Sequence, residues 1–170
     1  MGLIPPAVLG FFGAMDRAIR SKEVTRIIKA VESFRSLAFR EESEGAESFW
    51  QSIEECARQI TIRRRAAGRL QSVWGVTPIV GLQFGAAADR RLGIPSETLV
   101  FDTYYVTSEF DINLSDAQTQ ILSLGPDLFH AFRRCVFGWA LLSYDIFHLY
   151  NDRGLYEPAG GYGHDAYGIA

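Results

Sequence analysis

Apolar side chains recur at helical spacing through the first 68 residues of the chain. Six of them fall on one face of a predicted helix that begins after Ser21, a good N-cap residue: Val24, Ile27, Ile28, Val31, Phe34 and Leu37. A shorter helix is predicted over residues 7–20, and another runs from the polar break at 41–45 to a stop at Gly68. Residues 1–68 are therefore predicted to form an all-helical segment.

After Gly68 the pattern changes to short apolar segments that alternate with helices. Strands are predicted over 70–74, over 98–106, which is rich in β-branched and aromatic residues, and over 145–150. The mostly apolar run of the last segment indicates burial on both faces. The helices predicted between the strands cover residues 78–92, a short stretch from Ser115, and residues 126–142.

The first of these helices has clear end signals in the sequence. Thr77 is expected to cap it and Pro78 to occupy its first position, because proline lacks the N–H that this position leaves unpaired. Gly93 is expected just past its end, where a left-handed backbone conformation is common.

Strand, helix, strand, helix, strand in this order predicts an α/β fold. We expect a Rossmann-like parallel sheet of about three or more strands with flanking helices, preceded by the helical segment. Residues 69–157 would form this half domain, and the Gly- and Tyr-rich residues 158–170 an irregular tail. Three strands leave an exposed edge, so we expect the chain to be truncated relative to a larger protein.

Composition agrees with a globular fold and adds one asymmetry. The chain has 170 residues, 48% of them hydrophobic and 22% charged, and its net charge of -3 does not call for nucleic acid. Residues 1–70 carry 12 basic and 9 acidic side chains (+3), whereas residues 71–170 carry 5 and 11 (-6). The basic excess centres on Arg63, Arg64 and Arg65. These arginines suit a solvated helix end, or contact with anionic lipid headgroups or a phosphate-bearing acceptor.

Neither the cysteines nor the amino-terminal segment indicates secretion. Cys56 and Cys135 lie far apart within apolar patterns, which fits free thiols in a reducing compartment and neither a disulfide framework nor a zinc motif. The apolar residues 3–15 lack a preceding basic region and are too few to span a bilayer. We expect a cytoplasmic protein, with peripheral contact at the inner face of the membrane as an open alternative.

In an open parallel sheet, ligands bind beyond the carboxyl ends of the strands. Gly75 and Thr77 follow the first predicted strand, where a glycine and a helix N-terminus can approach an anion or a sugar hydroxyl. A tight turn explains them equally well. Tyr104, with Tyr105, ends the second predicted strand, and its ring suits sugar stacking or ordinary core packing.

The third predicted strand ends in a cluster of polar side chains. His148 or Asp152 is a candidate catalytic base for an acceptor hydroxyl, Asn151 a candidate partner of sugar hydroxyls, and Arg153 a candidate bidentate ligand of a phosphate or carboxylate. The alternative is a core histidine followed by a turn. No metal is expected, since adding His164 and Asp165 gives no known ligand spacing.

These segments together resemble bacterial glycosyltransferases of the GT-B fold. The resemblance is carried by residues 72–79 (SVWGVTPI), 88–93 (ADRRLG), 103–106 (TYYV) and 144–154 (YDIFHLYNDRG). It covers about residues 69–157 and consists of whole segments rather than one diagnostic motif. The first 68 residues show no such likeness.

The resemblance implies an enzyme in which two Rossmann-like domains face a cleft. In such enzymes the amino-terminal domain receives the acceptor and the carboxyl-terminal domain holds the nucleotide-sugar, typically without a bound metal. Carried onto this chain, the loops at 75–78 and 148–153 would line the acceptor side. The donor domain is absent, so we expect the acceptor-binding portion of the enzyme and no cofactor. The expected partners are a sugar or lipid-linked acceptor and a donor supplied by a missing domain or partner chain.

Two other interpretations stay open. The chain could be a non-catalytic interaction protein, a degenerate Rossmann-like fold whose helical front end, with the arginines at 63–65, docks on a partner or membrane. It could also be a small nucleotide-binding regulator, although no phosphate-binding fingerprint is present. Open apolar faces on the front helices would favour docking.

Overall fold

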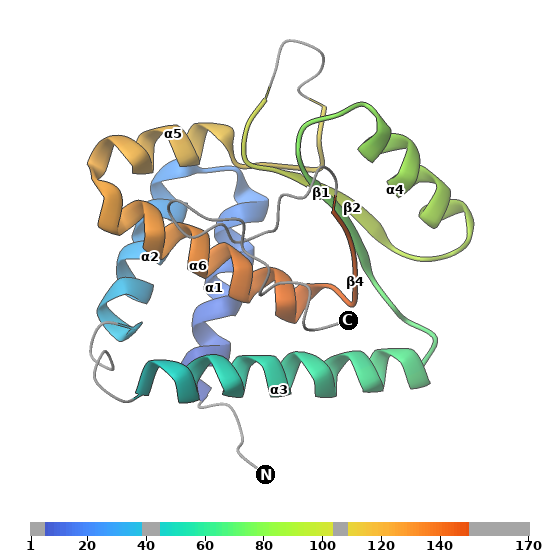
Figure 1. Cartoon of the computed structure of the whole chain (residues 1–170), viewed down its shortest axis with the longest axis horizontal. Coiled ribbons are helices and arrows are strands. Elements are labelled where there is room, and N and C mark those ends of the chain that lie inside the picture. The colour runs from blue at the N-terminus through green and yellow to red at the C-terminus, as the bar shows by residue number, and fades with distance from the viewer. Residues whose placement is uncertain (1–5, 39–44, 104–108, 150–170) are drawn as a thin grey trace.

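The computed structural model describes residues 6–38, 45–103 and 109–149 of the chain (Figure 1). Its elements in order are α1 (Pro6–Ser21), α2 (Val24–Ala38), α3 (Gly45–Ala66), β1 (Ser72–Val76), α4 (Gly81–Arg91), β2 (Ser96–Val100), β3 (Ile112–Asn113), α5 (Ser115–Leu124), α6 (Pro126–Ser143) and β4 (Ile146–Leu149). The predicted α/β class and the helical amino-terminal part are confirmed. The expected irregular tail at 158–170 lies outside the described residues.

The four strands form one parallel sheet in the order β3-β2-β1-β4. This order is that of the first four strands of a dinucleotide-binding Rossmann fold. Sequence patterns predicted three of the four strands. The fourth, β3, has only two residues, Ile112 and Asn113, which is too short a run to show a strand period.

The predicted burial of the last strand on both faces is wrong. All four residues of β4 are only partly buried. The strand order explains why, since β4 pairs with β1 on one side and ends the sheet on the other. Its apolar residues Phe147 and Leu149 pack against the main core, whereas His148 stacks on Trp74 on the opposite face.

Two predicted helix starts are also wrong. The helix α4 begins at Gly81 rather than Pro78, because the chain first makes a separate turn in which the Ile79 N–H donates to the Thr77 carbonyl at 2.9 Å. Thr77 therefore does not cap it. Similarly, Ser21 is the last residue of α1, and α2 begins three residues later. The predicted stop at Gly93 is confirmed, with a φ of 83°.

One face of the sheet is covered by a helical bundle built around α6. Figure 1 shows α1, α2, α5 and α6 together on this side, and α6 contacts α1, α2, α3 and α5. A single apolar cluster runs from Phe11 in α1 through Phe34 in α2 to Trp139 in α6 and Leu99 in β2. Gly138 allows the close approach, since a Cβ there would lie 2.8 Å from the Phe12 ring.

The apolar faces of α1 and α2 are largely closed within the chain. Phe12, Met15, Ile27 and Val31 are all at most 4% exposed. These described residues therefore do not form the open apolar face that would indicate a docking surface.

A buried carboxylate fixes α3 to the start of β4. The Asp145 side chain is fully buried and accepts hydrogen bonds from Thr61 Oγ1 at 2.7 Å and from the Gln71 N–H at 2.9 Å. Arg64 lies 3.4 Å from it and donates to the Ser143 carbonyl at 2.9 Å. Arg64 is thus turned into the protein, whereas Arg63 and Arg65 are exposed.

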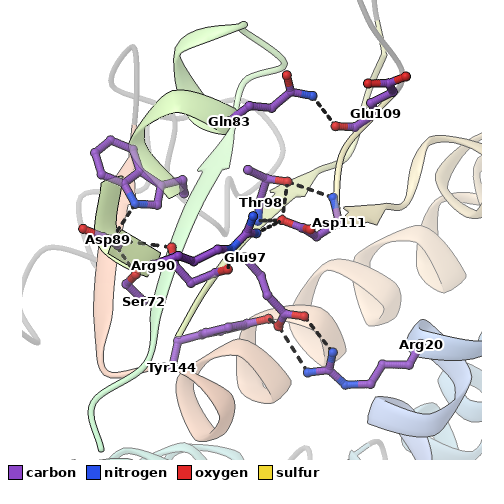
Figure 2. A network of polar contacts seen from close by, with 12 residues as sticks. Arg20, Ser72, Gln83, Asp89, Arg90, Glu97, Thr98, Glu109, Asp111 and Tyr144 are labelled. Carbon is purple, nitrogen blue, oxygen red and sulfur yellow. Dashed lines mark hydrogen bonds and ion pairs between the residues drawn. The ribbon is translucent and has the colours of Figure 1, made fainter. Parts of the chain in front are cut away.

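A second polar network joins the bundle to β2. Arg20 binds both oxygens of Glu97, at 2.8 and 3.2 Å, and the Tyr144 hydroxyl donates to Glu97 Oε2 at 2.5 Å (Figure 2). Burial, and then the hydrogen bond to Glu97, raise the pKa of Tyr144. This network lies on the bundle face of the sheet.

Among the described helices, none has the length and apolar character that a membrane crossing needs.

Candidate functional site

The carboxyl ends of β1 and β4 lie side by side at the point where the strand order reverses. In the parallel register Gly75 is paired with Leu149, so the loop after β1 starts beside the end of β4. We call this the β1–β4 rim. Four residues predicted for the site lie outside the described residues: Tyr104, Asn151, Asp152 and Arg153. Of the others, Gly75 and Thr77 lie at the rim itself, and His148 precedes it by one residue.

The need for glycine at position 75 comes from the neighbouring strand. A Cβ on Gly75 would lie 2.5 Å from the Leu99 carbonyl oxygen of β2. Any side chain would therefore force the two strands apart. Thr77 is only 9% exposed, so it shapes the turn before α4 rather than standing free in solvent.

His148 stacks flat on Trp74 on the α4 face of the sheet. The two residues are register partners in β4 and β1, and their rings lie 3.9 Å apart at 12°. Trp74 in turn lies against α4, where a Cβ on Gly85 would come within 2.5 Å of the indole. The His148 side chain remains 34% exposed because no described helix covers this side of β4. The imidazole is thus held in one plane and still open to solvent.

The carboxylate of Asp89 in α4 accepts hydrogen bonds from two strands and faces an imidazole on a third. Its Oδ2 accepts from Ser72 Oγ at 2.6 Å and from Trp74 Nε1 at 2.8 Å, both in β1, and from Ser96 Oγ in β2 at 3.5 Å. His148 Nε2 in β4 lies 3.5 Å from the same oxygen. We call this set, with Asp89 at its centre, the Asp89 hub; Figure 2 shows Asp89 and Ser72 within it.

Burial acts to raise the pKa of Asp89, but the hub more than reverses this effect. Hydrogen bonds from Ser72, Trp74 and Ser96, together with the nearby imidazole of His148, lower the pKa below its ordinary value. Asp89 is therefore an ionised carboxylate at neutral pH, with 14% of its side chain exposed.

Sequence reasoning assigned no role to Asp89, although a signal was present. In α4 the residues that face the sheet are Leu82 and Ala86, both fully buried. Asp89 follows Ala86 by three positions and so falls on the same face of the helix. A carboxylate on the buried stripe of a helix requires hydrogen-bond donors opposite it, and Ser72 and Trp74 in the preceding strand supply them.

A neighbouring carboxylate, Asp111, has a structural role. It accepts from the Thr98 N–H at 2.9 Å and from Thr98 Oγ1 at 3.0 Å, and it pairs with Arg90 at 2.5 Å (Figure 2). These contacts attach the start of β3 to β2 and α4.

At the Asp89 hub an imidazole and a carboxylate lie 3.5 Å apart. No group of three or more His, Cys, Asp and Glu side chains in the described part of the chain could hold a metal ion. An imidazole that faces a carboxylate can accept a proton from a hydroxyl and share the resulting charge. A search of protein-family models, of curated proteins and of solved structures finds no match to this chain.

Proposed function

We propose that the chain is the acceptor-binding portion of a glycosyltransferase that works with a donor-binding domain or partner. The observation that carries the proposal is the pairing of Gly75 with Leu149, because the reversal of strand order beside them is where open α/β sheets bind ligands. The GT-B resemblance of residues 69–157 supports the same location and suggests a sugar-bearing acceptor.

The chemistry of the rim favours a hydroxylated acceptor over a nucleotide phosphate. A phosphate-binding turn offers several free backbone N–H groups. Here Pro78 has none, and the N–H of Ile79 is already bonded to Thr77. The absence of a side chain at Gly75 is explained by its close contact with Leu99, and a bound phosphate is not needed to explain it. In this proposal the diphosphate leaving group is therefore bound by the donor-binding partner.

In the proposed reaction His148 acts as the base. The acceptor hydroxyl oxygen bonds to the anomeric carbon of the sugar while the bond from that carbon to the nucleotide diphosphate breaks. The hydroxyl proton passes to His148, and the electron pair leaves with the diphosphate. Asp152, a residue outside the described ranges, is the second candidate base.

Ligand binding by the chain itself tests the proposal. Saturation-transfer NMR with a panel of methyl glycosides, and separately with UDP-glucose and GDP-mannose, compares acceptor-like and donor-like probes. We expect at least one methyl glycoside to bind and neither nucleotide-sugar to bind tightly. His148→Gln should weaken glycoside binding about tenfold, the equivalent of about 1.4 kcal/mol. His130→Gln, which alters a histidine of α6 away from the hub, is the matched control. Tight binding of a nucleotide-sugar, or glycoside binding unaffected by His148→Gln, contradicts the proposal.

A narrower proposal concerns peripheral membrane contact. Arg63 and Arg65 are exposed at the end of α3, and Ile62 beside them is 53% exposed. A cationic surface with an apolar side chain suits an anionic bilayer. Co-sedimentation with phosphatidylglycerol vesicles should fall for Arg63→Gln/Arg65→Gln, with phosphatidylcholine vesicles as the control. Equal sedimentation of the variant and the unaltered chain contradicts this role.

A further inference from the structure

The His148 side chain lies between two groups, the Trp74 ring and the Asp89 carboxylate. Stacking on Trp74, at 3.9 Å and 12°, fixes the plane of the imidazole. Asp89 lies at its edge, with Oδ2 3.5 Å from Nε2. A flat ring that is held in one plane and faces a carboxylate with one nitrogen presents its other nitrogen in a defined direction. An unrestrained histidine on a strand would sample several rotamers.

Asp89 is itself fixed in place. Ser72 and Trp74 hold Oδ2 at 2.6 and 2.8 Å, and these donors come from the strand next to β4. The carboxylate therefore cannot turn away from β4 without losing two short hydrogen bonds. Trp74 contacts both residues, since its indole N–H donates to Asp89 and its ring stacks on His148.

The distance of 3.5 Å also has a chemical meaning. It is longer than a direct hydrogen bond, and such contacts commonly shorten when a catalytic group is loaded. When the imidazole takes up a proton, its positive charge is attracted to the carboxylate. The arrangement thus places a carboxylate beside the ring that would receive the hydroxyl proton.

We infer that Asp89 is the positioning residue of the proposed active site. Asp89 holds the proton of neutral His148 on Nε2, so that Nδ1 is free to accept the proton of the acceptor hydroxyl. The inference rests on the proposed function for the identity of the acceptor. It adds Asp89, whose hydrogen-bond partners Ser72 and Ser96 are the first residues of β1 and β2, to the proposed chemistry of His148.

Nitrogen-resolved NMR of the imidazoles in the full chain tests the inference. Long-range proton–nitrogen correlation spectra are recorded at a pH where the imidazoles are neutral, and His148→Gln identifies the His148 signals by their loss. We expect His148 to be a single tautomer with the proton on Nε2. A tautomer mixture, or a proton on Nδ1, in the unaltered chain overturns the inference.

Variants and a ligand separate positioning from simple packing. Asp89→Ala should convert His148 to a tautomer mixture, whereas Ser72→Ala, which removes one donor but keeps the carboxylate, should not. A methyl glycoside that binds the unaltered chain should shift the Nδ1 signal, and Asp89→Ala should abolish this shift. If the glycoside binds and Nδ1 does not respond, the positioning role is wrong although the proposed function survives. If no glycoside binds while the Nε2 tautomer is observed, the proposed function fails and Asp89 only anchors the strand.

Discussion

The two faces of the sheet are built in different ways. The bundle face is covered by several helices around α6 and buries one continuous apolar cluster that includes Phe132 and Trp139. The face toward α4 is covered by that one helix and has a small apolar cluster of Leu82, Val100 and Phe110. On that face most of the organisation is polar and centres on Asp89.

The difference separates stability from chemistry. Burial of apolar area supplies most of the free energy of folding, so the bundle face carries the stability of the chain. The α4 face leaves Trp74 and His148 partly exposed and places an ionised carboxylate beside them. A group that reacts with a ligand has to be accessible, and a rigid bundle behind the sheet allows the other face to stay open.

The largest expected effect comes from a core deletion on the bundle face. Phe132 is fully buried, so Phe132→Ala should lower the free energy of unfolding by about 3–5 kcal/mol. Phe84 in α4 is 73% exposed, and the same substitution there should change it by less than about 0.5 kcal/mol. Denaturant unfolding of both variants measures the contrast. Equal losses would mean that α4 carries as much stability as the bundle.

A smaller loss is expected from removing Arg64. This side chain is 26% exposed, so Arg64→Ala should cost about 1–3 kcal/mol because the buried Asp145 loses its charged partner and the Ser143 carbonyl loses a donor. Arg65→Ala, one position away and exposed, should change stability little. Thermal unfolding of the pair checks this, and an equal effect of the two substitutions would contradict the inward role of Arg64.

Glycine replacements compare how tightly the two faces are packed. The added methyl group of Gly138→Ala would clash with Phe12, and that of Gly85→Ala with Trp74. Each clash should lower the free energy of unfolding by about 1–3 kcal/mol, partly offset by the better helix propensity of alanine, about 1 kcal/mol. Gly10→Ala meets nothing within 4 Å and should be neutral or stabilising. Gly138→Ala should change the fluorescence of Trp50, which lies 3.3 Å from the added Cβ, and Gly85→Ala should change that of Trp74. Fluorescence that is unchanged in Gly85→Ala would argue against the contact with α4.

The pH dependence of stability should also differ between the faces. On the bundle face the pKa values of Tyr144 and Cys135 are raised, chiefly by burial. Their contribution is therefore complete below the unfolded values of about 10 and 8.5 and is lost as the pH rises above them. On the α4 face the pKa of Asp89 is lowered, so its contribution is complete above about pH 4 and is lost as the pH falls.

Unfolding free energies measured across the pH range check both signs. Tyr144→Phe should reduce the alkaline slope only, and Asp89→Asn the acid slope only. The same slopes in the variants and the unaltered chain would show that neither group titrates differently on folding.

Hydrophobic periodicity was sufficient for the fold class because long helices and β-branched strands leave strong local signals. The helix around Val31 and the strand around Val73 were both predicted from such runs. Features set by strand order were missed: the two-residue β3, and the edge position of β4 that leaves His148 half-exposed. The Asp89 hub depends on which strands lie beside α4, and that information is not local in the sequence.

The central claim is that the acceptor binds at the β1–β4 rim. A map of amide shifts of the full chain with a bound methyl glycoside tests it most directly. We expect the largest shifts at Gly75, Val76 and Leu149, together with the imidazole of His148. Shifts confined to α1, α2 and α3, with none at these positions, would contradict the claim.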